Sequence, residues 1–190
     1  MTYPTTNIAT GDLVTASQLN RMHTAVAQAT DAGASYTFSS IPQVWTHLMI
    51  VCHLQTASGS QIDDLWVRFN GDTSAKYISQ YLRAIDTTVS GDGTSADTKI
   101  LAGAVPGSSS GGFSTNVLFV ANYTAAKYHS LVAVAHGAYD NAGATHQRIG
   151  VAGGAWFPTS PAAITQIQLL PSADAFVDGS MATLSVGGLI

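Results

Sequence analysis

A serine flanked by glycines is the first residue of this sequence whose context could do chemistry. Residues 107–111 read GSSSG and match the G-x-S-x-G pattern of a nucleophile elbow, with Ser109 in the position of the nucleophile. In that elbow the serine ends a strand and opens a helix. Here Pro106 stands directly before the motif, and a strand-like run over 113–122 follows it. The pattern therefore predicts a Ser/Gly linker and no catalytic serine.

Histidines and aspartates are the candidate metal ligands, because the chain has no glutamate and a single cysteine. His47 and His53 share one face of a predicted strand, but about 20 Å of extended chain separates them. One cysteine excludes the usual structural zinc sets within one chain. Asp92 and Asp97 flank a Gly-containing loop that could hold Ca²⁺, although the spacing is not that of an EF-hand. We expect no metal and no cofactor, with a histidine site on a symmetry axis as an alternative.

Acid pairs and exposed aromatic rings are the remaining candidates for a site. Glycoside hydrolysis would need two aspartates, and no spacing singles out a pair; Asp63 and Asp64 are expected in a turn before Leu65. Large aromatic residues commonly anchor sandwich cores, so only an exposed pair beside a loop would be a candidate for stacking on sugar rings. The sequence therefore predicts no enzyme. The aromatic candidates are Trp45, Trp66, Trp156, Tyr77, Tyr81, Tyr123, Tyr128 and Tyr139.

Composition limits the partners of the chain. Its 190 residues are 46% hydrophobic, which is enough to bury a core. Only 9% are charged, with a net charge of −4, against about 25% charged residues in ordinary domains. Electrostatic binding to nucleic acid or to anionic lipid is therefore disfavoured. Cys52 has no partner for an intrachain disulfide, and no secretory signal or membrane helix is recognisable. We expect the protein to fold in a cytoplasm.

The N-terminal residues are expected to form an arm and a helix ahead of the main domain. Residues 1–14 have no hydrophobic period and predict an extended arm. Thr15 and Gln18 fit a capping box, which predicts an amphipathic helix over 15–32. This helix either packs on its own domain or bundles with copies of itself around a symmetry axis. Its apolar stripe consists of Leu19, Met22, Val26 and Ala29.

Residues 33–190 are expected to form one β-sandwich domain. Apolar runs alternate with clusters of Gly, Ser, Asp and Pro, and Asn70-Gly71 is the clearest hairpin signal. Many strands without intervening helices predict an all-β, antiparallel, jelly-roll-like sandwich. The expected strands are 35–39, 45–55, 65–70, 77–89, 98–105, 113–122, 129–139, 147–157, 164–170 and 181–189.

Several of these strands are apolar on both faces. In the run 45–55, Leu48 and Ile50 lie on one face, and His47 and Met49 lie on the other. An isolated sandwich buries one face of each sheet and leaves the other polar. We therefore expect the second face to be covered in a homo-oligomer, with a trimer ahead of a dimer. The expected interface residues are Leu19, Met22, Val26, Trp45, His47 and Met49.

Three segments resemble virion proteins of tailed bacteriophages. Residues 11–20, GDLVTASQLN, are similar to an opening phrase of phage tail-fibre and head-attached proteins, roughly G-D-x-V-T-A-x-x-L/M-N. The second segment is FNGD at 69–72, followed by Tyr77. The third, over 164–184, resembles the closing strand pair of small phage β-sandwich modules. Such chains commonly end in Leu-Tyr-Gly-Leu/Ile, whereas residues 184–190 read LSVGGLI, without the tyrosine.

This resemblance implies a non-enzymatic structural protein on the surface of a virion. The implied role is that of a capsid decoration protein, a head fibre or a tail-fibre component. Its N-terminal arm and helix would attach to the particle, and its sandwich would face outward. The implied partners are copies of itself and other virion proteins, assembled in the host cytoplasm. The alternative is a receptor- or glycan-binding adhesion module of a tail fibre.

Overall fold

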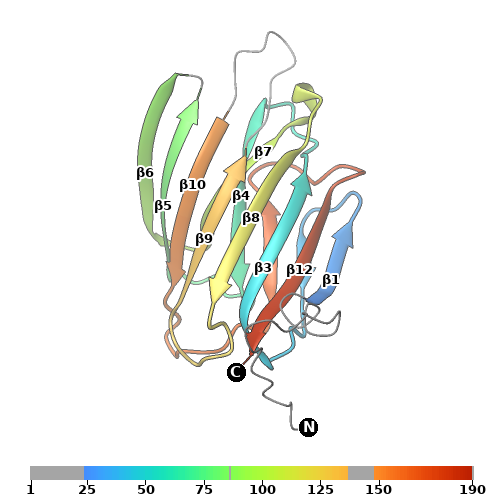
Figure 1. The fold of residues 1–190 in the computed structure, drawn as a ribbon. Coiled ribbons are helices and arrows are strands. Elements are labelled where there is room, and N and C mark those ends of the chain that lie inside the picture. Colours follow the sequence, from blue (N-terminus) through green and yellow to red (C-terminus); the bar gives the residue numbers. More distant parts are fainter. Residues whose placement is uncertain (1–23, 86, 137–147, 190) are drawn as a thin grey trace, which may run out of the picture.

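Two antiparallel β-sheets face each other in the structure, a computed structural model that describes residues 24–85, 87–136 and 148–189 (Figure 1). The described strands are β1 (Thr24–Thr30), β2 (Tyr36–Phe38), β3 (Trp45–Leu54), β4 (Ile62–Phe69), β5 (Tyr77–Ile85), β6 (Thr88–Asp97), β7 (Ile100–Pro106), β8 (Ser114–Ala121), β9 (His129–His136), β10 (Arg148–Trp156), β11 (Ile167–Pro171) and β12 (Met181–Leu189). A short 3₁₀ helix, η1 (Ser108–Ser110), lies between β7 and β8.

The two sheets differ in width. The large sheet has eight strands in the order β1-β12-β3-β8-β9-β10-β5-β6, and the small sheet has four in the order β2-β11-β4-β7. Every pairing between neighbouring strands is antiparallel. The edge strand β7 of the small sheet packs against β9 and β10 of the large sheet. Strand β5 also contacts β7, whereas the edge strand β6 is almost entirely exposed and extends the large sheet beyond the small one.

The core lies between the sheets and follows from the alternation of side chains along each strand. In β3, Leu48, Ile50 and Cys52 point inward and are buried. In the facing small sheet, Leu65 and Val67 of β4 are fully buried. These residues belong to one continuous hydrophobic cluster that also includes strands at both ends of the described chain.

The structure confirms the all-β, two-sheet part of the prediction, and each strand expected from residue 35 onward overlaps a described strand. The run 77–89 is wrong as one strand, because it divides into β5 and the start of β6. The jelly-roll arrangement stays a prediction. No described helix is long and apolar enough to cross a membrane.

The helix predicted over 15–32 is wrong for its described part. Thr24–Thr30 forms strand β1, which pairs with β12. The segment TAVAQAT contains three β-branched residues, which favour strands, and β1 satisfies the backbone groups along an edge of β12 that would otherwise be unpaired. The predicted arm over 1–14 and the first half of the predicted helix lie outside the described residues.

The buried thiol of Cys52 predicts a loss of stability in alkaline solution. Burial raises the pKa of this thiol in the folded protein. Its stabilising contribution is therefore complete below the pKa of an unfolded cysteine, about 8.5, and is lost as the pH rises above it. We expect the free energy of unfolding to fall by about 1.4 kcal/mol per pH unit between about pH 9 and 10.

Urea unfolding of the wild type and of Cys52→Ala across this pH range measures the effect. The variant lacks the titrating group and is expected to show a flatter dependence, whatever its stability at neutral pH. An equal slope in both proteins would show that another group causes the loss.

Candidate functional site

The outer face of the large sheet is the candidate functional site. We define it as the side chains of β3, β8, β9, β10 and β5 that point away from the small sheet. None of its described members is Asp, Glu, Lys or Arg. These members are His47, Met49, Val51, His53, Thr115, Val117, Phe119, Ala121, Ser130, Val132, Val134, Ile149, Val151, Gly153, Ala155, Ile78, Gln80, Leu82 and Ala84.

Strand register lines up the apolar members of the outer face in rows across the sheet. Val51 pairs with Val117, Val117 with Val134, Val134 with Val151, and Val151 with Leu82. These five residues come from five different strands and form one unbroken apolar row. Val134 and Leu82 are each 57% exposed. Water therefore contacts a continuous apolar surface, and such surfaces mark interaction sites.

The neighbouring row of the outer face contains both a projection and a hollow. Phe119 pairs with Val132, and Val132 pairs with Gly153. Phe119 is 40% exposed. A depression at Gly153 is lined by side chains that include Val132, Val151 and Leu82. A Cβ atom built at Gly153 meets only the Leu131 carbonyl oxygen, at 3.4 Å. The hollow therefore exists because residue 153 has no side chain.

The predicted interface residues divide between the outer face and the core. His47 and Met49 lie on the outer face, as predicted, and both are half-buried. Val26 and Trp45 pack against the hydrophobic core of their own chain. Both are half-buried, and their part in an interface stays a prediction. Leu19 and Met22 lie outside the described residues.

The histidines stack on aromatic rings. The ring of His53 stacks on Phe113 with 4.5 Å between centroids, and that of His47 is tilted against Phe119 at 5.5 Å. Nδ1 of His47 is buried without a hydrogen-bond partner. In the described parts of the chain, no three His, Cys, Asp or Glu residues lie close enough to hold a metal ion.

The other sequence motifs are parts of regular structure. Ser109 lies in η1, which leads into a strand, and its hydroxyl donates to the Ser60 carbonyl at 3.1 Å. Asp92 and Asp97 do not flank a loop, because the segment between them is part of strand β6. The turn predicted at Asp63 and Asp64 is wrong, because both lie in β4.

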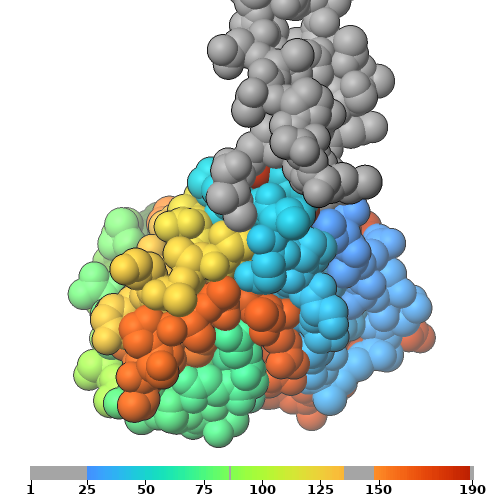
Figure 2. All heavy atoms as spheres, turned by 90° about the horizontal axis from the view of Figure 1, so that it is seen from below, coloured from blue at the N-terminus to red at the C-terminus, as the bar shows by residue number. Residues whose placement is uncertain are grey.

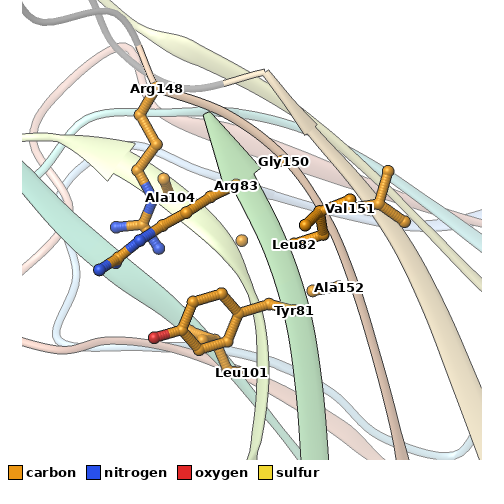
Figure 3. Close-up of a pocket in the computed structure, with 10 residues that line it drawn as sticks. Tyr81, Leu82, Arg83, Leu101, Ala104, Arg148, Gly150, Val151 and Ala152 are labelled. Carbon is orange, nitrogen blue, oxygen red and sulfur yellow. The ribbon is translucent and has the colours of Figure 1, made fainter. Parts of the chain in front are cut away.

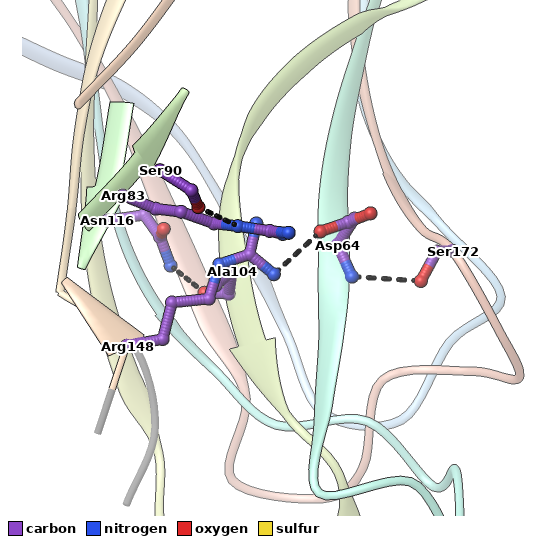
Figure 4. Close-up of polar contacts among 7 residues, drawn as sticks. All are labelled: Asp64, Arg83, Ser90, Ala104, Asn116, Arg148 and Ser172. Atoms are coloured by element: carbon purple, nitrogen blue, oxygen red, sulfur yellow. Dashed lines mark hydrogen bonds and ion pairs between the residues drawn. The ribbon is translucent and has the colours of Figure 1, made fainter. Parts of the chain in front are cut away.

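A small pocket between β5, β10 and β7 contains two arginines (Figure 3). Arg148 is buried, and its Nη1 lies 2.9 Å from Oδ1 of Asp64 on β4 (Figure 4). Arg83 lies over the ring of Tyr81, with Cζ 5.2 Å from its centroid. Among the described residues that line the pocket, none is serine, cysteine or histidine. The ion pair between Arg148 and Asp64 links β10 of the large sheet to β4 of the small sheet.

The loops after β4, β8 and β10 meet at one end of the sandwich (Figure 2), and two exposed aromatic residues of these loops contact each other. Tyr128 is 57% exposed and Phe157 is 38% exposed. Their ring centroids are 5.4 Å apart in an edge-to-face arrangement. The Phe157 amide donates to the Lys76 carbonyl at 2.8 Å, which holds two of these loops together. Sequence reasoning included Tyr128 among the aromatic candidates and missed Phe157.

Three of the other aromatic candidates are buried. Tyr77, Tyr123 and Trp156 are core residues. Tyr77 donates to the Phe69 carbonyl at 3.1 Å, and Trp156 Nε1 donates to Oδ2 of Asp72 at 2.8 Å. Burial raises the pKa of Tyr77. These rings therefore support the fold and are closed to ligands.

Comparison of the chain with protein-family models and with curated proteins finds no match.

Proposed function

We propose that this chain is a non-enzymatic structural protein of a tailed-phage particle that buries its outer face on assembly. The proposal includes three roles: capsid decoration protein, head fibre and tail-fibre component. It also includes a jelly-roll-like fold related to phage sandwich modules. The observation that carries it is the uncharged apolar row from Val51 to Leu82. The resemblance of residues 11–20 and 164–184 to virion proteins is the reason for proposing a phage particle as the assembly.

Burial of this surface would provide the free energy of assembly. Each fully buried Val or Leu side chain contributes about 1.5–3 kcal/mol. Half of this surface is already removed from water in the free chain, so each row residue contributes roughly half of that amount. Five such residues would supply several kcal/mol for each copy. Repetition by particle symmetry would make attachment nearly irreversible. In this proposal, the residues ahead of β1 make the contact with the particle.

A lysine at the centre of the outer face tests the proposal. Val134 is 57% exposed, so Val134→Lys is compatible with the fold, but the complex would bury an unpaired charge. The phage that encodes the chain is grown with the gene deleted and with the protein supplied from a plasmid. We expect wild-type chain in purified particles and at least tenfold less of the variant.

Thr37→Lys is the matched control, because Thr37 is an exposed residue on the small sheet. It is expected to be incorporated like the wild type. Deletion of residues 1–14 is expected to prevent incorporation while the sandwich stays folded. Absence of wild-type chain from the particles, or equal incorporation of both lysine variants, would contradict the proposal.

The second candidate is a glycan-binding adhesion module, favoured by the exposed Tyr128–Phe157 pair. Rings of this kind stack on the apolar faces of sugars. The particle experiment separates the two candidates. Normal incorporation of Tyr128→Ala together with loss of adsorption to the host would favour the adhesion module.

A further inference from the structure

We infer that the occupant of the outer face is a second copy of this chain, related by a twofold axis that runs along β9. The inference rests on the proposed function, in that both need this face to be buried. It adds the partner, the symmetry and the residues that interlock. The specific contact is Phe119 of each copy inserted into the Gly153 hollow of the other.

Strand order provides the first step. In the large sheet, β8 lies on one side of β9 and β10 lies on the other. A twofold axis along β9, in the plane between two facing sheets, places the β8 of each copy over the β10 of its partner. The same rotation places β3 over β5, since each of these lies two strands from β9.

Register provides the second step. Phe119, Val132 and Gly153 occupy the same row on β8, β9 and β10. A rotation about β9 keeps the position along the strands, so Phe119 of one copy lies over Gly153 of the other. Packed sheets lie about 10 Å apart, and a phenyl ring fills much of that gap. Packed sheets are rotated by roughly 30° relative to each other. For residues on the strands next to the axis, about 4.8 Å away, this rotation is a shift of only about 2.5 Å.

The apolar row obeys the same symmetry. Val134 lies on β9 and would meet its own copy near the axis, while Val117 would lie over Val151 of the partner. Val51 on β3 would lie over Leu82 of the partner, because the two share this row. Each apolar residue of the row thus meets another apolar residue. The face is complementary to itself, as an isologous interface requires.

The size of the face also suits a dimer. Its five strands have 8 to 10 residues each. With about 4.8 Å between strands and about 3.3 Å per residue, they cover about 700 Å² of sheet. Each partner in a standard stable interface buries about 800 Å². A cyclic trimer would need two different surfaces on every copy, whereas the outer face is one continuous sheet surface. The geometry therefore favours the dimer over the trimer.

Sedimentation equilibrium of the purified full chain tests the inference. We expect a particle of twice the chain mass of 19.6 kDa. Phe119→Ala removes the projection, and Gly153→Phe fills the hollow. Each is expected to raise the dimer dissociation constant at least tenfold. Both positions face solvent in the single chain, and circular dichroism with thermal unfolding verifies that each variant folds.

The double variant Phe119→Ala/Gly153→Phe exchanges projection and hollow. We expect its dissociation constant to return to within about threefold of the wild type, because the new ring at 153 faces the new space at 119. A trimer, a monomeric wild type, single variants without effect, or a double variant weaker than both singles would each overturn the inference. The particle experiment decides the proposed function separately. A monomeric wild type that needs Val134 for incorporation would leave that function standing, and a dimer absent from particles would contradict it.

Discussion

Gly154→Ala is expected to lower the free energy of unfolding by about 1–3 kcal/mol, the cost of overpacking a filled interior. A Cβ atom at this position would lie 2.5 Å from the Ile78 carbonyl oxygen and 2.5 Å from Cγ2 of Ile100. The first atom belongs to the backbone of the paired strand β5, and the second belongs to a fully buried residue. Neither can move without disturbing the β10–β5 pairing or the core.

Gly153→Ala is the matched control, one residue away on the same strand. Its new methyl group would point to the outer face and meet only the Leu131 carbonyl oxygen, at the ordinary contact distance of 3.4 Å. Glycine in a strand is destabilising by roughly 0.5–1 kcal/mol relative to alanine, so this variant is expected to keep or gain stability as a monomer. Urea unfolding of both variants, at a protein concentration where the chain is monomeric, gives the comparison. An equal loss of unfolding free energy in both variants would show that the effect does not depend on whether the new methyl group points to the core or to the outer face.

Removal of the Asp64 carboxylate, the counter-charge of Arg148, is also expected to lower the free energy of unfolding strongly. Its ion pair with Asp64 connects β10 of the large sheet to β4 of the small sheet (Figure 4). The Arg148 side chain is 10% exposed and that of Asp64 is 34% exposed. Breaking a buried pair costs about 3–5 kcal/mol. Because solvent screens the exposed part of Asp64, we expect about 1–3 kcal/mol for Asp64→Asn.

Arg148→Met is expected to cost less than Asp64→Asn. The methionine keeps much of the apolar stem of the arginine and leaves no buried charge behind, since the remaining carboxylate of Asp64 can be hydrated. Urea unfolding of both single variants and of the double variant measures the coupling between the two residues. A larger loss for Arg148→Met, or fully additive losses, would show that the ion pair contributes little.

Much of the sandwich could be predicted from local patterns. The alternation in 45–55 led to a strand where the structure has β3. A turn with positive φ is present at Asn70-Gly71. The hairpin predicted there is wrong, because β4 and β5 lie in different sheets and do not pair with each other. The apolar character of both faces of β3 was also visible, because successive side chains along a strand point to opposite sides. His47 and Met49 were therefore placed on the outer face without knowledge of the neighbouring strands.

Two strands were missed, and each depends on a partner strand. β1 has the apolar spacing of a helix, and only the free edge of β12 makes it a strand. β6, with the sequence TVSGDGTSAD, has no apolar period at all and is a strand because it pairs with β5. Pairing of this kind satisfies backbone hydrogen bonds, which a pattern of side chains does not encode.

The amino-acid order alone specified which residues alternate, where the chain turns and how little charge the strands carry, since these properties depend on neighbours along the chain. Three-dimensional packing determined that Phe119, Val132 and Gly153 share a row and that Arg148 reaches Asp64. Those contacts join residues far apart in the sequence, and strand register fixes them. A shift of register by one residue would send every side chain of a strand to the opposite face. The candidate interface is therefore a property of sheet order and register, although each of its residues was already apolar in the sequence.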